Sequence, residues 1–286
     1  MLLIGILSLI VPLSFINSYP LQFDHNAPAD IFEMNKKMAL KQKTLSRGYA
    51  KDLLESQKWT NGIVPYTIDA SYSAAAVSII NSGMRLIEDS TRIGGKDCIK
   101  FVGRTTETTY LRIFSDTGCW SYIGKVFTGA QQLSLKMPTA ASSGSCLFTG
   151  TVAHELIHAL GFDHEHVRPD RNNFVTINWD KIRADATSNF QIVSNGLDLG
   201  FEYDYDSIMH YESTAFSIDG SPTIEPLQSG VQLINKFNQT YLTATDIGEI
   251  REFYGCSSSA IKNVIDLATI FFILATHFLK KNSRNF

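Results

Sequence analysis

The sequence predicts a globular fold of mixed helices and strands. Two patterns and the composition support this fold class. Some segments carry apolar residues at helical spacing, while others alternate polar and apolar residues as strands do. Of the 286 residues, 44% are hydrophobic, which supports a full core. The formal charge, 25 − 28 = −3, gives no reason to expect a nucleic-acid partner.

The chain begins with an apolar run that is typical of a secretory signal peptide. Residues 1–18 contain no charged side chain and are followed by polar residues, so we expect cleavage after Ser18. The alternative, an uncleaved membrane anchor, stays open because the run approaches the length of a bilayer span. Residues 19–57 are polar and charged, and we interpret them as a propeptide that is cleaved near Arg47. A polar leader without a regulatory role is the alternative.

Short strands and helices are predicted between residues 59 and 256. Strand patterns occur at Gly62–Ile68, Tyr110–Phe114, Gln131–Met137 and Phe174–Ile177. Helices are predicted at Ser73–Glu88, at Trp179–Phe190, and from a cap at Thr245–Ile247 to Tyr254.

Two covalent features are expected of a secreted chain. Its four cysteines are widely spaced, unlike those of a zinc knuckle, and they are Cys98, Cys119, Cys146 and Cys256. After a signal peptide such cysteines form disulfides, and the sequence alone allows three pairings. The sequon that begins at Asn238 predicts a glycosylation site.

The segment His154–Arg171, with the sequence HELIHALGFDHEHVRPDR, carries the candidate site. A helix turns about 100° per residue, so His154 and His158 project from one face and can hold a single cation. Gly161 is a helix-ending residue that lets the chain turn sharply, which brings His164 back to the same cation. Three neutral imidazoles leave a fourth position open for water, which is the arrangement of catalytic zinc sites rather than structural ones.

Glu155 lies beside the predicted metal ligands without being one of them. It is offset from the two helical histidines, so it is better placed to reach a metal-bound water than the metal. This is the position of a general base. A separate apolar stripe faces the core and consists of Ala153, Leu156, Ile157 and Leu160.

The segment resembles the signature of the astacin family of zinc metalloendopeptidases, which belongs to the metzincins. In that family a glutamate and an Arg-x-Asp-Arg run follow the third histidine, and here these residues are Glu165, Arg168, Asp170 and Arg171. Asn172 stands where the family usually has a third aspartate, a difference expected to affect local loop pairing. The resemblance covers residues 58–256. Its other matching segments are Trp59–Tyr66, Gly118–Gly124 and the Met-turn Ser207–Tyr211.

The resemblance implies an α+β fold of the metzincin type with two subdomains. A twisted mixed sheet and the zinc helix lie above the cleft, and a more irregular C-terminal half lies below it. One zinc ion per chain is bound by His154, His158 and His164. The strand Gln131–Met137 is expected at the sheet edge, where it hydrogen-bonds an extended peptide substrate.

The implied activity is hydrolysis of extracellular proteins by a secreted or surface endopeptidase. Glu155 acts as the general base on a zinc-bound water. Tyr211 ligates zinc in the resting site and hydrogen-bonds the oxyanion during the reaction. Met209 forms a hydrophobic floor beneath the histidines. Glu165 pairs with the amino terminus that maturation frees.

The resemblance also bears on disulfide pairing and latency. It favours the pairs Cys98–Cys256 and Cys119–Cys146. In the family a propeptide aspartate within a Phe-x-Gly-Asp motif occupies the zinc until maturation. The nearest segment here, Phe32–Asn35, lacks both the glycine and the aspartate, so the means of latency stays open.

The expected partners are protein or peptide substrates and an activating protease. Extracellular matrix, cuticle and egg-coat proteins are all compatible substrates for the family. The alternative functions are a catalytically silent, zinc-stabilised extracellular binding protein and a hydrolase of non-peptide substrates.

Residues 257–286 form a tail with a marginal apolar segment at 264–279, followed by two lysines. The segment is short for a bilayer span, and its approach carries charged residues. Free secretion is the expectation, and anchoring at the cell surface through this segment is the alternative.

Overall fold

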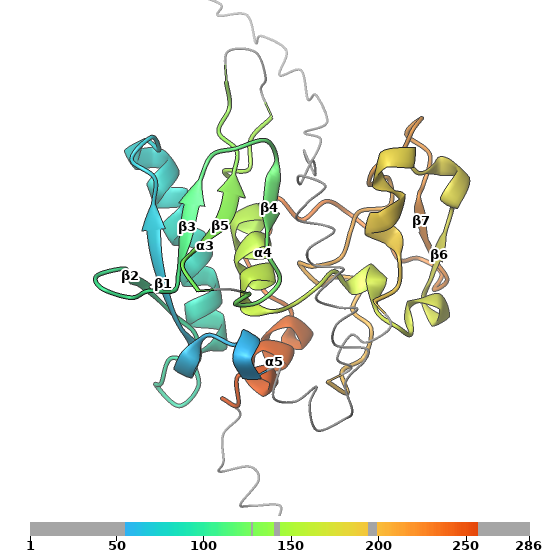
Figure 1. The fold of residues 1–286 in the computed structure, drawn as a ribbon. Helices are drawn as coiled ribbons and strands as arrows, with labels where there is room; N and C mark the ends of the chain where they lie inside the picture. Colours follow the sequence, from blue (N-terminus) through green and yellow to red (C-terminus); the bar gives the residue numbers. More distant parts are fainter. Residues whose placement is uncertain (1–54, 127, 140–143, 194–198, 257–286) are drawn as a thin grey trace, which may run out of the picture.

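The computed structural model describes residues 55–126, 128–139, 144–193 and 199–256. The predicted signal peptide, the propeptide as far as residue 54 and the tail after residue 256 lie outside these residues. The described chain forms two lobes, with helix α4 on the side of the first lobe that faces the second (Figure 1). Among the described residues, no helix combines the length and apolar character needed to cross a membrane.

A five-stranded sheet forms one layer of the first lobe (Figure 1). Its spatial order is β2-β1-β3-β5-β4; β4 runs antiparallel to β5, and the other pairs are parallel. The strands are β1 (Ile63–Ile68), β2 (Lys100–Gly103), β3 (Tyr110–Phe114), β4 (Cys119–Ser121) and β5 (Ala130–Leu135). The expectation that Gln131–Met137 forms the edge strand is wrong, because β4 folds back along β5 and occupies the edge.

Two helices, α3 (Ala74–Thr91) and α4 (Thr149–Leu160), pack against each other in this lobe, and α4 also contacts β4 and β5. Ser73 caps α3, as its Oγ accepts a hydrogen bond from the Ala76 N–H at 3.2 Å. The helices approach closely at Gly83, where an added Cβ would lie 2.5 Å from a methyl carbon of Val152. This contact fixes the position of α4 against the core.

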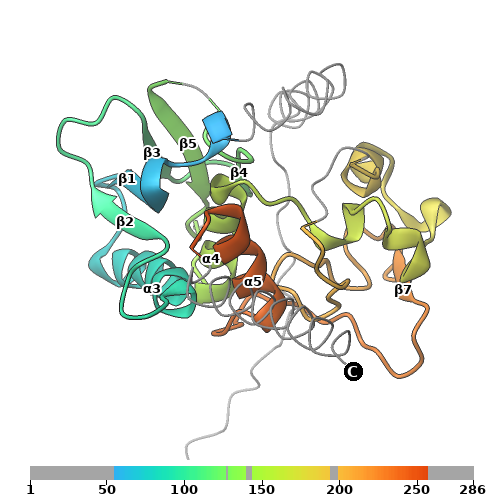
Figure 2. The same ribbon diagram turned by 90° about the horizontal axis from the view of Figure 1, so that it is seen from below.

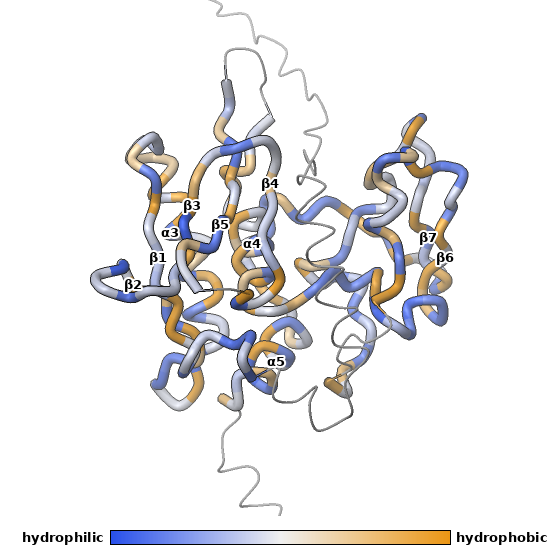
Figure 3. The backbone as a smooth tube through the Cα atoms, viewed as in Figure 1, coloured by the Kyte–Doolittle hydropathy of each residue, from blue (hydrophilic) through white to orange (hydrophobic). Residues whose placement is uncertain are grey.

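The second lobe has less regular structure. It contains a two-stranded antiparallel ribbon of β6 (Val175–Ile177) and β7 (Ile224–Pro226), together with short 3₁₀ helices. These helices are η2 (Glu165–Val167), η3 (Arg171–Asn173), η4 (Trp179–Lys181) and η5 (Ala184–Phe190); a further one, η1 (Thr60–Gly62), lies in the first lobe. Each lobe has its own buried apolar cluster, and apolar segments occur in both lobes of Figure 3.

The prediction of one helix over Trp179–Phe190 is wrong. Ile182 is extended and forms a β-bridge with Ser217, and the Arg183 N–H donates to the Phe216 carbonyl at 3.0 Å. These contacts with a distant segment replace helical hydrogen bonds and divide the region into η4 and η5.

Helix α5 (Ala244–Phe253) returns the chain to the first lobe and lies beside α4 in the view from below (Figure 2). Its cap is Thr243 rather than the predicted Thr245, since Thr243 and Asp246 exchange the hydrogen bonds of a capping box. The structure contains the disulfides Cys98–Cys256 and Cys119–Cys146, the pairs that the family resemblance favours.

Candidate metal centre

Helix α4 and the turn that follows it bring three histidines together. His154 and His158 are one helical turn apart on α4 and are almost fully buried. Gly161 ends the helix in the left-handed conformation, with φ of 118°, and its N–H donates to the His158 carbonyl at 2.9 Å. The chain then returns so that His164 joins the other two, and candidate ligand atoms of all three residues lie within 4.8 Å of one another.

The outward-facing ring nitrogens of the three histidines have hydrogen-bond acceptors beside them. His154 Nδ1 donates to the Ile208 carbonyl at 2.9 Å, and His158 Nδ1 donates to the Phe162 carbonyl at 2.7 Å. His164 Nδ1 lies 3.4 Å from a carboxylate oxygen of Asp163. These contacts place the protons on Nδ1, so the Nε2 lone pairs face one another and can bind one cation together.

The spacing of the Nε2 atoms fits zinc. His164 Nε2 lies 3.2 Å from the Nε2 atoms of both His154 and His158. A tetrahedral zinc ion with Zn–N distances of about 2.0–2.1 Å holds its ligand nitrogens about 3.3 Å apart. Burial lowers the pKa of His154 to about 4, which keeps the imidazole neutral at physiological pH, as metal binding requires.

Glu155 is also buried, with 3% of its surface exposed. It lies on α4 between the two helical histidines in sequence. Burial raises the pKa of its carboxyl to about 8. A carboxyl with a pKa near neutrality can both accept and return a proton, which is the property required of a general base that later acts as an acid.

Tyr211 lies against this cluster. Its ring centroid is 4.4 Å from that of His164, and the ring stacks on His166 with a centroid separation of 4.1 Å. Phe190 completes the packing with an edge contact at 5.9 Å. The tyrosine is therefore held at the histidine cluster by aromatic packing from the second lobe.

The Met-turn Ser207–Tyr211 is held by α4 and α5 together. Its Ile208 carbonyl accepts the hydrogen bond from His154, and Met209 is buried with 4% exposure. The buried carboxylate of Asp246 on α5 accepts from Ser207 Oγ at 2.6 Å and from the Ile208 N–H at 3.3 Å. Asp246 thus fixes the turn that orients a metal ligand.

Three comparisons with known proteins place this geometry in a family. The family model for astacin, which is described as a peptidase family, matches residues 52–255. The chain belongs to the astacin family. Zinc metalloproteinase nas-6 of Caenorhabditis elegans is 37% identical over 72% of this chain and 56% of its own length. High choriolytic enzyme 1 of Oryzias latipes is 38% identical over 70% of this chain and 69% of its own length.

A solved structure shows the same fold. It is that of high choriolytic enzyme 1, described as a hatching enzyme zinc-protease from medaka fish, with a TM-score of 0.60 and 37% identity over 69% of this chain and 92% of that one. The chain spans only about half the length of several curated relatives, including 46% of the chicken astacin-like metalloendopeptidase. In this astacin-family domain, His154, His158 and His164 form the zinc site.

The Arg-x-Asp-Arg run of the astacin domain forms two separate clusters. Arg168 makes a bidentate ion pair with Asp170, at 3.0 Å for each bond, and a further one with Glu165 at 3.2 Å. Glu165 also accepts from the Asp204 N–H at 2.9 Å, yet burial raises the pKa of its carboxyl to about 8. Glu165 is therefore a buried acid whose charge is only partly compensated.

Arg171, the other arginine of the run, is 3% exposed. It donates to the carbonyls of His166 and Phe190 and, through Nε, to the Asn172 side-chain oxygen at 2.6 Å. Burial lowers the pKa of the Arg171 guanidinium. Among the described residues no carboxylate forms an ion pair with it, so the unusual Asn172 offers an uncharged acceptor to a buried cation.

Two features beside the site were not predicted from the sequence. Asp246 is one; the local signal is the helix start predicted at Thr245–Ile247, but the residue that exchanges hydrogen bonds with Asp246 is Thr243. The other is a pocket bordered by His154 and Tyr211, to which Glu212, Asn235 and Lys236 also contribute. Asn238, the candidate glycosylation site, is exposed in the turn after this pocket.

Proposed function

We propose that this chain is a secreted zinc endopeptidase that hydrolyses extracellular proteins. The observation that carries the proposal is the convergence of three imidazoles beside the buried carboxyl of Glu155 and the ring of Tyr211. Every residue type that peptide hydrolysis requires is present within this one site.

When bound, zinc supplies Lewis acidity, which polarises the scissile carbonyl and makes a water molecule easier to deprotonate. Glu155 takes the proton from the attacking water and returns it to the leaving amine. Its carboxyl is buried on the same helix as His154 and His158, so it is held beside the groups that would bind the metal.

Tyr211 donates a hydrogen bond from its hydroxyl to the oxyanion that forms on the substrate. Burial raises the pKa of this hydroxyl, so the phenol keeps its proton and acts as a donor. Stacking on His166 holds the ring at the site, while Asp246 holds the turn whose Ile208 carbonyl orients His154. We assign Tyr211 to transition-state stabilisation and Met209 to packing.

Glu165 is assigned to the amino terminus that maturation frees. It borders a second pocket that Asp163, Asp246 and Glu249 also line. An ammonium group would compensate the buried charge of Glu165, whose pKa is raised in its absence. Extending the mature amino terminus by two residues should therefore weaken activity, whereas the same addition at the carboxyl terminus should not.

Secretion is supported by the signal-like residues 1–18 and by two disulfides, which persist in oxidising compartments. We propose residues 19–57 as the propeptide and residues 58–256 as the protease domain. Asn238 is proposed as a glycosylation site because it is exposed. The medaka relative is named a hatching enzyme, so egg-coat proteins are candidate substrates together with matrix and cuticle proteins.

The test is cleavage of a denatured protein by the matured chain, with zinc content measured in parallel. We expect one zinc ion per chain and cleavage that a chelator abolishes and added zinc restores. His158→Ala should lose both zinc and cleavage. Stoichiometric zinc with no cleavage of any protein would instead support the zinc-stabilised binding protein.

A further inference from the structure

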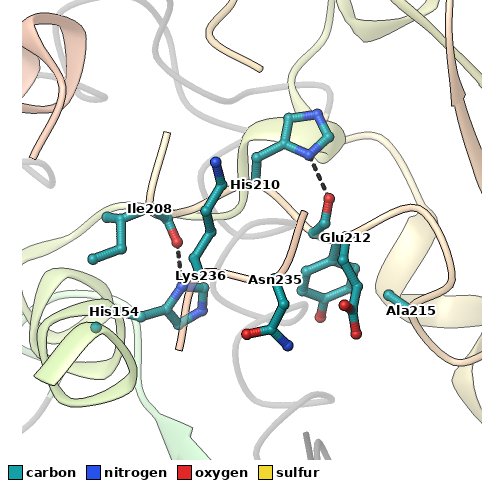
Figure 4. Close-up of a pocket in the computed structure, with 9 residues that line it drawn as sticks. His154, Ile208, His210, Glu212, Ala215, Asn235 and Lys236 are labelled. Atoms are coloured by element: carbon teal, nitrogen blue, oxygen red, sulfur yellow. Dashed lines mark hydrogen bonds between the residues drawn. The ribbon is translucent and has the colours of Figure 1, made fainter. Parts of the chain in front are cut away.

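His210 follows Met209 in the Met-turn, and the proposed mechanism gives it no role. Its side chain is buried, with 3% of its surface exposed, and both ring nitrogens have hydrogen-bond partners. Nδ1 lies 2.7 Å from the backbone carbonyl oxygen of Tyr211, and Figure 4 shows this hydrogen bond as a dashed line from the His210 ring. Since a carbonyl oxygen only accepts, Nδ1 is the donor. The ring of His210 therefore holds the peptide group that follows Tyr211.

The other ring nitrogen of His210 is held by Tyr203. The Tyr203 hydroxyl lies 2.7 Å from Nε2 and can donate to it, because Nδ1 carries the proton of the neutral ring. The hydrogen bond made by one nitrogen of an imidazole decides which nitrogen is protonated and how the ring is turned. Without the hydroxyl, the ring could turn over and present a carbon atom to the Tyr211 carbonyl. Tyr203 thus fixes the orientation in which His210 reaches Tyr211.

Tyr203 is itself held firmly in the second lobe. Its side chain is almost fully buried, and its ring stacks on Phe174 with a centroid separation of 4.5 Å and an angle of 8° between the planes. The guanidinium carbon of Arg168 lies 5.7 Å from the centroid of the Tyr203 ring, within the range of a cation–π contact. The next backbone N–H, that of Asp204, donates to the Glu165 carboxylate at 2.9 Å. These contacts hold the Tyr203 hydroxyl in one place.

The hydrogen bond from His210 adds a backbone restraint to the packing of the Tyr211 ring. Contacts with His166 and Phe216 restrain the plane of that ring. The hydroxyl is the side-chain atom farthest from the backbone, so a small rotation of the Tyr211 backbone displaces it most. Catalytic groups must be held within about 0.5 Å and about 10–20° of the productive geometry. Both the ring and the backbone of Tyr211 therefore need to be fixed.

We infer that Tyr203 and His210 are positioning residues, which hold Tyr211 so that its hydroxyl meets the oxyanion. Tyr203 acts by orienting His210, and His210 acts by holding the backbone of Tyr211. The inference rests on the proposed peptidase function and on the oxyanion contact assigned there to Tyr211.

The first test is Tyr203→Phe in the matured, zinc-loaded chain, with cleavage of one peptide measured over a range of concentrations. This change keeps the ring that stacks on Phe174 and removes the hydroxyl. A misplacement of about 1 Å can cost about 100-fold in rate, and the loss of one hydrogen bond should shift the Tyr211 hydroxyl by less. We expect kcat to fall about tenfold while KM changes by less than about twofold, as for an interaction made only in the transition state.

Variants of His210 test the second link. His210→Phe keeps a ring but loses both hydrogen bonds, so kcat should fall at least as far as in Tyr203→Phe. His210→Asn should recover part of the loss, because its amide N–H can donate to the Tyr211 carbonyl. Circular dichroism and metal analysis check the fold and zinc content of each variant.

A matched control and a second background separate positioning from general stability. Tyr205→Phe also removes one hydroxyl, which donates to the Phe174 carbonyl at 2.7 Å, and it should leave kcat within about twofold of the wild type. In a Tyr211→Phe background, Tyr203→Phe should cause no further loss of kcat, because the hydroxyl that it positions is absent. The same fold loss in both backgrounds would show independent effects and overturn the inference.

A readout that does not depend on cleavage is the NMR spectrum of the chain with ¹³C-labelled tyrosine rings. The Tyr211 signal is identified by its absence in Tyr211→Phe. It should move in Tyr203→Phe and stay in place in Tyr205→Phe. If the wild type cuts peptide while Tyr203→Phe leaves both kcat and the Tyr211 signal unchanged, this inference alone is overturned. If the wild type cuts no peptide, the proposed peptidase function fails and the inference with it.

Discussion

Asp246 is predicted to stabilise both the fold and the zinc site from a distance. Its carboxylate, 5% exposed, accepts hydrogen bonds from Ser207 Oγ, from the Ile208 N–H and from the Thr243 N–H. Asp246→Asn preserves the shape of the side chain. It replaces one acceptor oxygen by an NH₂ group, which then faces one of these three hydrogen-bond donors. Leaving a buried donor unsatisfied costs roughly 1–3 kcal/mol, so we expect a loss of about 2 kcal/mol in the free energy of unfolding.

The same substitution should weaken zinc binding. The Ile208 carbonyl orients His154, and loss of outer partners of a metal ligand lowers affinity by about 10–100-fold. Asp246 contacts the turn that carries the Ile208 carbonyl rather than His154 itself, so we expect the zinc affinity to fall by about tenfold. Urea unfolding of the metal-free protein and competition with a chromophoric chelator measure the two effects. Asp185→Asn, at an exposed aspartate, is the control. If Asp246→Asn matched the wild type in both assays, the proposed support of the Met-turn would be refuted.

Three further predictions follow from buried contacts. Asn172→Asp should stabilise the protein by about 1 kcal/mol in thermal or urea unfolding, because it gives buried Arg171 a charge-assisted partner; destabilisation would contradict this. Burial lowers the pKa of His210 to about 4, whereas unfolding returns it to about 6.5, so the unfolded chain binds more protons below pH 6.5. The metal-free protein should therefore lose stability as the pH falls from about 6.5 to 4, by roughly 2–3 kcal/mol from His210 alone, and an unchanged melting temperature over this range would exclude a buried neutral histidine. Gly83→Ala should cost about 1–3 kcal/mol through overlap with Val152, and adding Val152→Ala should recover part of the loss in the same melting experiment.

The zinc site was predictable because most of its information is local. His154, Glu155 and His158 lie on one helix, whose periodicity fixes their relative directions. Gly161 supplies the turn that returns His164 to them. The segment from His154 to His164 therefore determines the arrangement of the three metal ligands through its local structure, without contacts from distant segments.

The features that could not be predicted depend on contacts between distant segments. Strand β5 was expected at the sheet edge but is internal, because β4 pairs with it. The alternation of polar and apolar residues predicts a strand and does not identify the strands beside it. Ile182 leaves the helical conformation because it bridges Ser217, which lies far along the chain. The pocket wall of Glu212 and Asn235 likewise exists only because two loops hydrogen-bond to each other.

The central claim, hydrolysis with Glu155 as the general base, is tested most directly by Glu155→Gln. This change keeps the size of a buried side chain and removes its ability to accept the proton. Wild type and variant should be compared at equal zinc content on the same peptide, by single-turnover rate. We predict that the variant binds zinc and loses at least about 100-fold in rate, since general acid–base groups contribute about 10²–10⁴-fold. A variant that bound zinc and cut at the wild-type rate would contradict it.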